Sequence, residues 1–573
     1  MAKRERFTIG RALLLCLGVS TGCYTGIQEL NGGAASGGDA GGNDGGSDDS
    51  EGPDGLGPAE EMPVPTTRFF RLTHVQWENT VQDLFDLDEP SGLSVDFRAD
   101  AREGGFIFDN NATSLEVDEA LWSGYQRAAV DMAEIAVNDP SILEFIAPDT
   151  GDDASRAAGF IRDFGRRAFR RPLTDAEATI YAELFNRGPE LYEETEGFAA
   201  GVRLVLEAIL QSPNFLYRIE ISEEVVDDVI PLSSFEVASR MSYFLLDTMP
   251  DDELLDLAEA GELQDPDQVQ AQARRLLENP RAKMVVQKFH HTLLEVEKFQ
   301  QAAPSPAFYP DAPENLGDLA EQEHDLFVDH TVFDQDGSWG DLLTSTQTFV
   351  NADLAPLYGL SGDFGEEFTL VDLDPNERRG LFTQIGFLAA NATGVHPDPI
   401  HRGAYRARQI ACHSIAAPPD TVPPVPEGDP DATNRETVVA HTEAPGTECL
   451  GCHKPLINPF GFPFENYDST GAFRTEDNGR TVDASATVAL ASGAVEVSNA
   501  VDLAEAMAAD EQVHQCYLEH WTEYTMGRPY DDLDEAIVDR LAEASVGDAS
   551  VKELLVEFAT SRPFLTRSTE EMQ

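Results

Sequence analysis

The chain has 573 residues, and its 39 Lys and Arg against 104 Asp and Glu give a formal net charge of −65. At roughly 150 residues per domain this length corresponds to about four domains, and a hydrophobic content of 41% is enough for a sizeable core. The acidic balance excludes non-specific nucleic-acid binding, which needs a basic surface, and argues against charge-driven docking on anionic lipid.

The first 23 residues have the layout of an export signal. Four basic residues precede an apolar run at 12–19, which is too short to cross a bilayer. Small residues at 20–22 then lead to Cys23, an order similar to the lipobox of bacterial lipoproteins, in which the cysteine carries the lipid. We therefore predict a lipoprotein signal at 1–23 with Cys23 as the lipid anchor. Ordinary secretion is the alternative.

A segment rich in Gly, Ser and Asp follows the signal. Such a composition cannot bury enough apolar surface to fold, so residues 24–64 are predicted to be a flexible tether. Together these features predict an exported, membrane-anchored lipoprotein of the bacterial cell envelope, in the periplasm or on the cell surface. Its membrane contact is expected to be the lipid anchor.

The pattern between residues 65 and 390 predicts helices. Three capping boxes, in which a Ser or Thr and a Glu or Gln three residues later satisfy each other's backbone donors, precede apolar stripes of helical period. The boxes are Thr73 with Gln76, Thr174 with Glu177, and Ser233 with Glu236. A further long helical stretch is expected from about 267 to 299. We place helical modules at 65–150, 151–222 and 223–390.

The composition and periodicity of the chain change near residue 393, and we place a boundary near 390. A Pro-rich stretch at 418–430 is expected to be extended, and weak alternation at 482–497 predicts a small hairpin. Helical patterns return from about 499 to 561. The expected fold class is mainly α, with several helical modules in tandem and a C-terminal cytochrome c-like unit that carries a small β-hairpin. That unit comprises a haem motif module at 391–485 and a closing helical module at 486–573.

One motif carries chemistry. Cys449, Cys452 and His453 form C-x-x-C-H, the attachment pattern of c-type haem. Two thiols three positions apart can each add to a haem vinyl group, and the imidazole that follows can ligate the iron. One covalent haem c is therefore expected. A Cys449–Cys452 disulfide, a zinc site and a thioredoxin-like redox site are the alternatives, although neither the second ligand pair of a zinc site nor a βαβ context is evident.

The sixth iron ligand has two leading candidates. Met526 lies 73 residues after His453, in a predicted C-terminal helix, and a Met ligand would favour electron transfer by raising the potential. His441 precedes the motif by eight residues and could also reach the iron. An open sixth position, which would permit peroxide or O₂ chemistry, is the third possibility.

The remaining cysteines suggest a disulfide. Removing Cys16 with the signal and Cys23 as the anchor leaves four cysteines, and a haem would use two of them. Cys412 and Cys516 then remain, and a lone pair in an oxidising compartment is most simply a disulfide. A redox pair of Cys412 with His413 is the alternative.

The segment from Cys449 to Arg474 resembles a module of large exported proteins of planctomycetes and myxobacteria. In that family C-x-x-C-H precedes an I-[DN]-P-x-G-F run and an acidic-aromatic turn, and H-R-G and G-R-P signatures flank it. The flanking signatures are similar to residues 401–403 and 527–529 here, and Asn458 stands where Asp is usual. The resemblance extends over nearly all of residues 68–562 and implies tandem domains of unknown function catalogued as 1587, 1595, 1592, 1588 and 1585.

Three functions follow from these features. The first is extracytoplasmic electron transfer, as a carrier or as the redox subunit of an oxidoreductase, with an unidentified redox partner. The second is an enzyme with an open haem, for which Glu465 and Asp468 are nearby in sequence, although we expect both to accept backbone hydrogen bonds in a turn. The third is a surface binding or scaffold lipoprotein for a glycan or protein, with C-x-x-C as a structural disulfide.

Overall fold

The computed structural model describes residues 58, 61–100, 105–149, 151–192, 194–416 and 431–570. The predicted signal, Cys23, most of the tether and all of the Pro-rich stretch lie outside these ranges. Within them the chain forms 23 α-helices, and its strands pair only into two-stranded antiparallel sheets, which confirms a mainly α fold. None of the helices in the described ranges is both long enough and apolar enough to span a bilayer.

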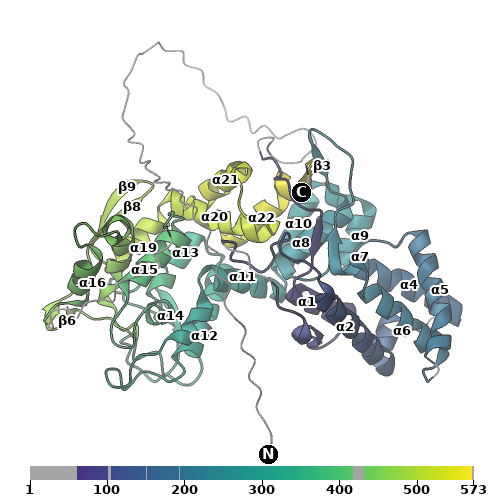
Figure 1. Ribbon diagram of the computed structural model, residues 1–573, viewed down its shortest axis with the longest axis horizontal. Coiled ribbons are helices and arrows are strands. Elements are labelled where there is room, and N and C mark those ends of the chain that lie inside the picture. The colour runs from purple at the N-terminus through teal and green to yellow at the C-terminus, as the bar shows by residue number, and fades with distance from the viewer. Residues whose placement is uncertain are drawn as a thin grey trace, which may run out of the picture. The chain divides into compact units, whose positions relative to one another are not determined.

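The first two predicted modules share one hydrophobic core. Buried side chains from both segments, Trp77 and Leu206 among them, belong to the same cluster. Figure 1 shows α4, α5 and α6 side by side, with α2 against α6. The elements are β1 (Phe69–Arg71), α1 (His74–Leu84), α2 (Glu119–Asn138), α3 (Pro140–Ile146), α4 (Asp153–Phe169), α5 (Asp175–Leu191), α6 (Gly197–Leu210), α7 (Pro213–Leu216) and β2 (Tyr217–Ile219).

A second core joins the later segments to Phe106 and Phe108 of the first predicted module. It extends from Phe106 to Leu565 and includes Phe289, Trp339 and Trp521. Its helices before the predicted boundary at 390 are α8 (Ser234–Leu246), α9 (Asp252–Ala260), α10 (Pro266–Leu277), α11 (Pro280–Leu293), α12 (Leu316–Asp329), α13 (Trp339–Thr344) and α14 (Ile385–Ala390). The chain after this boundary forms α15 (Pro399–Tyr405), α16 (Asn434–Thr442), α17 (Cys449–Cys452), α18 (Asn458–Gly461), α19 (Ala500–Ala508), α20 (Glu511–Met526), α21 (Glu535–Val546), α22 (Val551–Thr560) and α23 (Arg562–Leu565), of which α16 and α17 contribute no side chain to this core.

The three predicted capping boxes are present. In each, the Ser or Thr side chain accepts from the backbone three residues later, and the Glu or Gln side chain returns to the cap backbone. The helical stretch expected at 267–299 is divided into separate helices. The chain forms α10 and α11 there, separated at Asn279, whose side chain caps the second helix. Pro280 explains the break, because proline cannot donate the hydrogen bond that would continue α10.

Sheets tie distant parts of the chain together. β3 (Val229–Pro231) pairs with β10 (Thr566–Ser568), and β1 pairs with β2. β4 (Gln347–Val350) pairs with β5 (Thr369–Asp372), and the short β6 (Glu476–Asp477) pairs with β7 (Arg480–Thr481). The predicted hairpin at 482–497 is formed by β8 (Ala486–Leu490) and β9 (Gly493–Val497).

Candidate functional site

The C-x-x-C-H motif spans two short helical elements. Cys449 and Cys452 begin and end α17, and a π-helical turn, η7 (His453–Ile457), follows and leads into α18. Both cysteines are free thiols and are partly exposed. Because residues three apart in a helix lie on the same face, the two sulfurs are presented on one side of the turn.

A hydrogen-bond chain orients His453. Its Nδ1 lies 3.2 Å from Oδ1 of the fully buried Asn458. The Asn458 Nδ2 donates to the Thr442 hydroxyl and to Oε1 of Glu443, both at 2.9 Å. Thr442 in turn donates its own proton to the carbonyl oxygen of Val438, so its oxygen must accept from Asn458.

These partners determine the tautomer of His453. A carboxylate oxygen can only accept, so the amide group of Asn458 must turn its NH₂ toward Glu443 and its oxygen toward the imidazole. Nδ1 of His453 therefore carries a proton, and Nε2 of the neutral ring has a free lone pair. Histidine ligands of metals are held in this way, with the other ring N–H given to a protein oxygen.

The neutral form of this histidine is favoured. Burial lowers the pKa of His453, and the nearby positive charge of His441 lowers it further against the opposing effects of Asn458 and Glu443. The electrostatic effect of His441 places that residue, at the end of α16, close to the motif. His441 is itself partly exposed.

The ligand atoms of the motif do not converge as those of a zinc site do. Zinc ligands lie about 3–4 Å apart around the ion. Cys449, Cys452 and His453 do not bring their three ligand atoms within 4.8 Å of one another. A haem does not require such convergence, because the thioether bonds and the iron bond attach to different atoms of the porphyrin. The donor set and the free Nε2 therefore fit a c-type haem better than a zinc ion.

The turn after the motif is held by the close packing of α15 against α18. A Cβ at Gly403 in α15 would lie 1.9 Å from the carbonyl oxygen of Ile457, and one at Gly461 in α18 would lie 1.9 Å from that of Pro399. Only glycine permits this approach of the two backbones. The H-R-G signature and the glycine after the motif are thus two sides of one contact.

Arg402 holds the chain that follows the motif. Its buried guanidinium donates to the carbonyl oxygens of Leu388, Asn391, Phe464, Tyr467 and Asp468. Burial lowers the pKa of Arg402 to about 10, so it stays a cation at neutral pH. The arginine of the H-R-G signature therefore has a structural role that its sequence context did not reveal.

The acidic residues after the motif behave differently from each other. Asp468 accepts from the backbone of Thr470 and Ala472 around Gly471, the turn role that we expected. Among the residues that the structure describes, no backbone N–H donates to the Glu465 carboxylate. It is buried and pairs instead with Arg474 and with the side chain of Asn434, and burial raises its pKa.

Met526 is not brought to the motif. Its side chain lines a cavity with Phe70, Arg218 and Phe564, and none of the other residues that line it belongs to the segment from 441 to 458. The reason is the direction of α20, whose last residue packs toward β1 and α23. Its role as a distal ligand, which rested on separation along the chain, has no support in this arrangement.

The other cysteines are joined to each other. The structure has a disulfide between Cys412 and Cys516, the pair named from the sequence, with Cα atoms 5.5 Å apart. His520 Nε2 lies 3.9 Å from the Cys516 sulfur and 3.1 Å from the Gln409 carbonyl oxygen. His413 does not pair with Cys412. Its Nε2 contacts the carbonyl oxygen of Ala489, in β8.

Sequence reasoning missed the residues that position His453. Thr442 and Glu443 act only through Asn458, and no local motif marks them. Asn458 itself could be noticed in the sequence, since it stands where the resembling proteins have Asp. Its hydrogen-bond partners could not be predicted, because they reach it only when the end of α16 packs beside α18.

Five family models match the chain in succession. Each is described as a protein of unknown function, and they are DUF1587 at residues 71–138, DUF1595 at 156–220, DUF1592 at 232–360, DUF1588 at 378–477 and DUF1585 at 494–564. The C-x-x-C-H motif falls inside the DUF1588 match. Neither the curated proteins nor the solved structures include a match to the chain. The order and coverage of the five matches show that the chain belongs to the family of multi-domain proteins that carry these five domains of unknown function in tandem.

Proposed function

We propose that this protein carries one covalent c-type haem and transfers electrons outside the cytoplasm, as a carrier or as the redox subunit of an oxidoreductase. Cys449 and Cys452 would hold the haem through thioether bonds, and His453 would ligate the iron through Nε2. A bound haem supplies a one-electron couple between its ferric and ferrous states.

The observation that carries the proposal is the fixed tautomer of His453. The bonds from Asn458 to Thr442 and Glu443 leave Nδ1 protonated and Nε2 free. The buried His514, by contrast, uses both of its ring nitrogens in hydrogen bonds within the fold, at 2.7 and 2.9 Å. The lowered pKa of His453 acts in the same direction, because a protonated ring cannot bind a metal.

The residues around the site have defined tasks in this scheme. Asn458 holds the ring of His453 and strengthens its basicity by accepting a hydrogen bond from the Nδ1–H group. Gly403 and Gly461 fix the distance between α15 and α18. The turn that carries His453 is therefore held in one position. His441 would be the candidate for a second iron ligand, since its charge affects His453.

We further propose that the protein is exported and held on a membrane by a lipid on Cys23. The basic and apolar order of residues 1–22 and the small residues before Cys23 support this proposal. More than one acyl chain gives stable anchoring. A Cys23→Ser variant is then expected in the soluble fraction of the cell envelope, whereas the wild-type protein stays with the membranes.

The haem is tested on the mature chain produced in a bacterial host with its haem c maturation system. We expect a thioether-type pyridine haemochrome spectrum at one haem per chain. Cys449→Ala and Cys452→Ala each remove one thioether bond and shift that spectrum, and His453→Ala abolishes the native ferrous spectrum. Lys454→Ala is the matched control, because this exposed neighbour has no assigned role and its variant should keep the full haem content.

A colourless, well-folded protein from that host would overturn the proposal. Mass spectrometry would then distinguish free thiols at Cys449 and Cys452 from a disulfide between them. A disulfide would favour the binding or scaffold function, in which the helical body recognises a glycan or a protein.

A further inference from the structure

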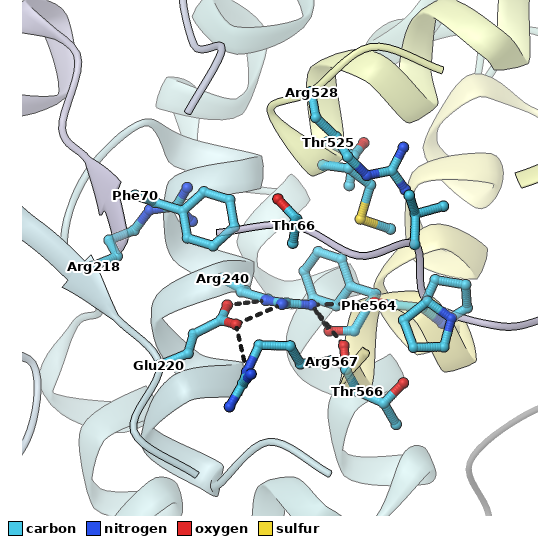
Figure 2. Close-up of a pocket in the computed structure, with 14 residues that line it drawn as sticks. Thr66, Phe70, Arg218, Glu220, Arg240, Thr525, Arg528, Phe564, Thr566 and Arg567 are labelled. Carbon is cyan, nitrogen blue, oxygen red and sulfur yellow. Dashed lines mark hydrogen bonds and ion pairs between the residues drawn. The ribbon is translucent and has the colours of Figure 1, made fainter. Parts of the chain in front are cut away.

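A small cavity rich in arginine lies far along the chain from the haem motif. Residues 63–70 and the segment after α7 line it on one side, and the end of α20 with α23 and β10 lines it on the other (Figure 2). Its volume is about 30 Å³. Four arginines and one glutamate face it: Arg218, Arg240, Arg528, Arg567 and Glu220. In a chain of net charge −65 this local excess of positive charge is unusual.

Most of these arginines already have carboxylate partners. Arg240 forms two hydrogen bonds to Glu220 and donates to three carbonyl oxygens of the segment 563–566. Arg567 lies 3.9 Å from the same Glu220 carboxylate. Arg528 forms two 2.7 Å hydrogen bonds to Asp534, a residue that does not line the cavity.

Arg218 is the exception. In the described part of the chain it forms no ion pair, and its buried Nε has no hydrogen-bond partner. Its guanidinium instead lies over the rings of Phe70 and Tyr243, at 5.1 and 5.4 Å from their centroids. Burial lowers its pKa to about 10, which leaves it charged at neutral pH. A desolvated cation without a partner carboxylate costs stability, and an anion beside it would recover that cost.

Two hydroxyl groups at the same cavity are also without partners. Oγ1 of Thr66 and Oγ1 of Thr525 are buried and form no hydrogen bond to any residue that the structure describes. In the view of Figure 2, Thr66 lies at the centre of the group, with Arg218 and Phe70 on one side and Thr525 and Arg528 on the other. Unsatisfied buried donors are rare in folded proteins, and three at one cavity indicate an absent acceptor.

We propose that this cavity binds a small oxyanion, through charge and hydrogen bonds from Arg218 and through the hydroxyls of Thr66 and Thr525. The volume suits a single anionic group such as sulfate, phosphate or a carboxylate, because one water needs about 10–15 Å³ of such space. A second cavity of about 80 Å³ shares Arg218, Glu220 and Arg240, so a larger acid could extend beyond the anionic group. The site is independent of the haem motif.

Calorimetric titration of the full mature chain tests this site. Sulfate, phosphate and acetate are titrated separately into protein held in chloride at the same ionic strength. We expect saturable binding of at least one of the three, with a matching rise in Tm. Arg218→Gln should weaken that binding about tenfold or more, because a hydrogen bond to a charged group contributes about 1.5–3 kcal/mol.

A second variant distinguishes the loss of anion binding from the loss of folding. Thr66→Val with Thr525→Val keeps side-chain shape and should weaken binding without removing any charge. The control is Arg274→Gln, which removes an exposed arginine paired with Glu553 and should leave binding unchanged. Absence of saturable binding for all three oxyanions, equal affinity for chloride, or undiminished binding in both cavity variants would each overturn the proposal.

Discussion

The identity of Asn458 sets the chemistry of His453 at the scale of one residue. An amide can donate to Glu443 and Thr442 while it accepts from the imidazole, and no other side chain of that size does both. The proteins that this segment resembles usually have Asp at this position. In this chain the amide of Asn458 donates a hydrogen bond to the carboxylate of Glu443, whereas an ionised aspartate at 458 would repel that carboxylate.

Asn458→Asp is therefore expected to destabilise the fold. The change would bring two carboxylates to 2.9 Å and leave Thr442 without its donor, at a cost of about 1–3 kcal/mol for a buried unsatisfied group. Adding Glu443→Gln should restore most of the loss, because the new amide can donate to the introduced carboxylate. Urea unfolding of the two single variants and the double variant measures this coupling. Full stability of the single Asn458→Asp variant would show that the amide is oriented the other way.

Glu323 gives a second residue-scale prediction. Its buried carboxylate accepts from Thr348 and Tyr358, and burial raises its pKa from 4.5 to about 7. The folded state thus binds this proton more tightly than the unfolded state. The contribution of Glu323 to the free energy of unfolding is therefore greatest below pH 4.5. It falls by on the order of 3 kcal/mol as the pH rises to about 7.

Unfolding measured from pH 4 to 8 tests that dependence. The Glu323→Gln variant keeps the oxygen that accepts from Thr348 and Tyr358 but cannot ionise. Relative to wild type it should gain stability across this interval. A constant difference between the two proteins over the whole range would contradict the raised pKa.

The contact between α15 and α18 operates at the scale of elements. Gly403 and Gly461 let two backbones meet directly, and this contact fixes where the turn after α17 lies. The helices are short, seven and four residues, so they have little stability alone and depend on this packing.

Gly403→Ala should be strongly destabilising. Its Cβ would lie 1.9 Å from the Ile457 carbonyl oxygen, so the backbones must separate, at a cost of about 3 kcal/mol or more. Haem content should fall with it. Gly451→Ala is the control inside the motif, because no atom lies within 4 Å of its Cβ and alanine favours the helix. Unfolding midpoints and haemochrome content of both variants are the readouts, and equal losses in the two would refute the packing argument.

At the scale of the whole molecule, the disulfide between Cys412 and Cys516 links the start of the predicted haem unit to its closing helices. It joins positions 104 residues apart. A cross-link of that span restricts the unfolded chain strongly, by about 4–5 kcal/mol in the chain-entropy model.

The variant with both Cys412→Ala and Cys516→Ala is expected to lose about that stability in urea. Reductant should lower the wild-type midpoint to the same value and leave the variant unchanged. The control is Cys449→Ala with Cys452→Ala, whose midpoint should still respond to reductant. A wild-type midpoint that ignores reductant would mean that the pair does not stabilise the fold.

Local patterns in the chain were enough to establish the helical class, the three capping boxes, the hairpin and the presence of the C-x-x-C-H motif. Each of these depends on residues a few positions apart, so it can be recognised without knowledge of the fold. The helical stretch at 267–299 was recognised in the same way, but its division at Pro280 into α10 and α11 was not.

Packing between distant segments set the remaining features. It turned the end of α20 away from the motif, placed Met526 at an arginine-lined cavity, and brought Asn458 beside Thr442 and Glu443. It also merged the predicted modules into shared cores. These outcomes depend on contacts between segments far apart in the chain, whose relative positions are set by the burial of whole helix faces and not by any local pattern.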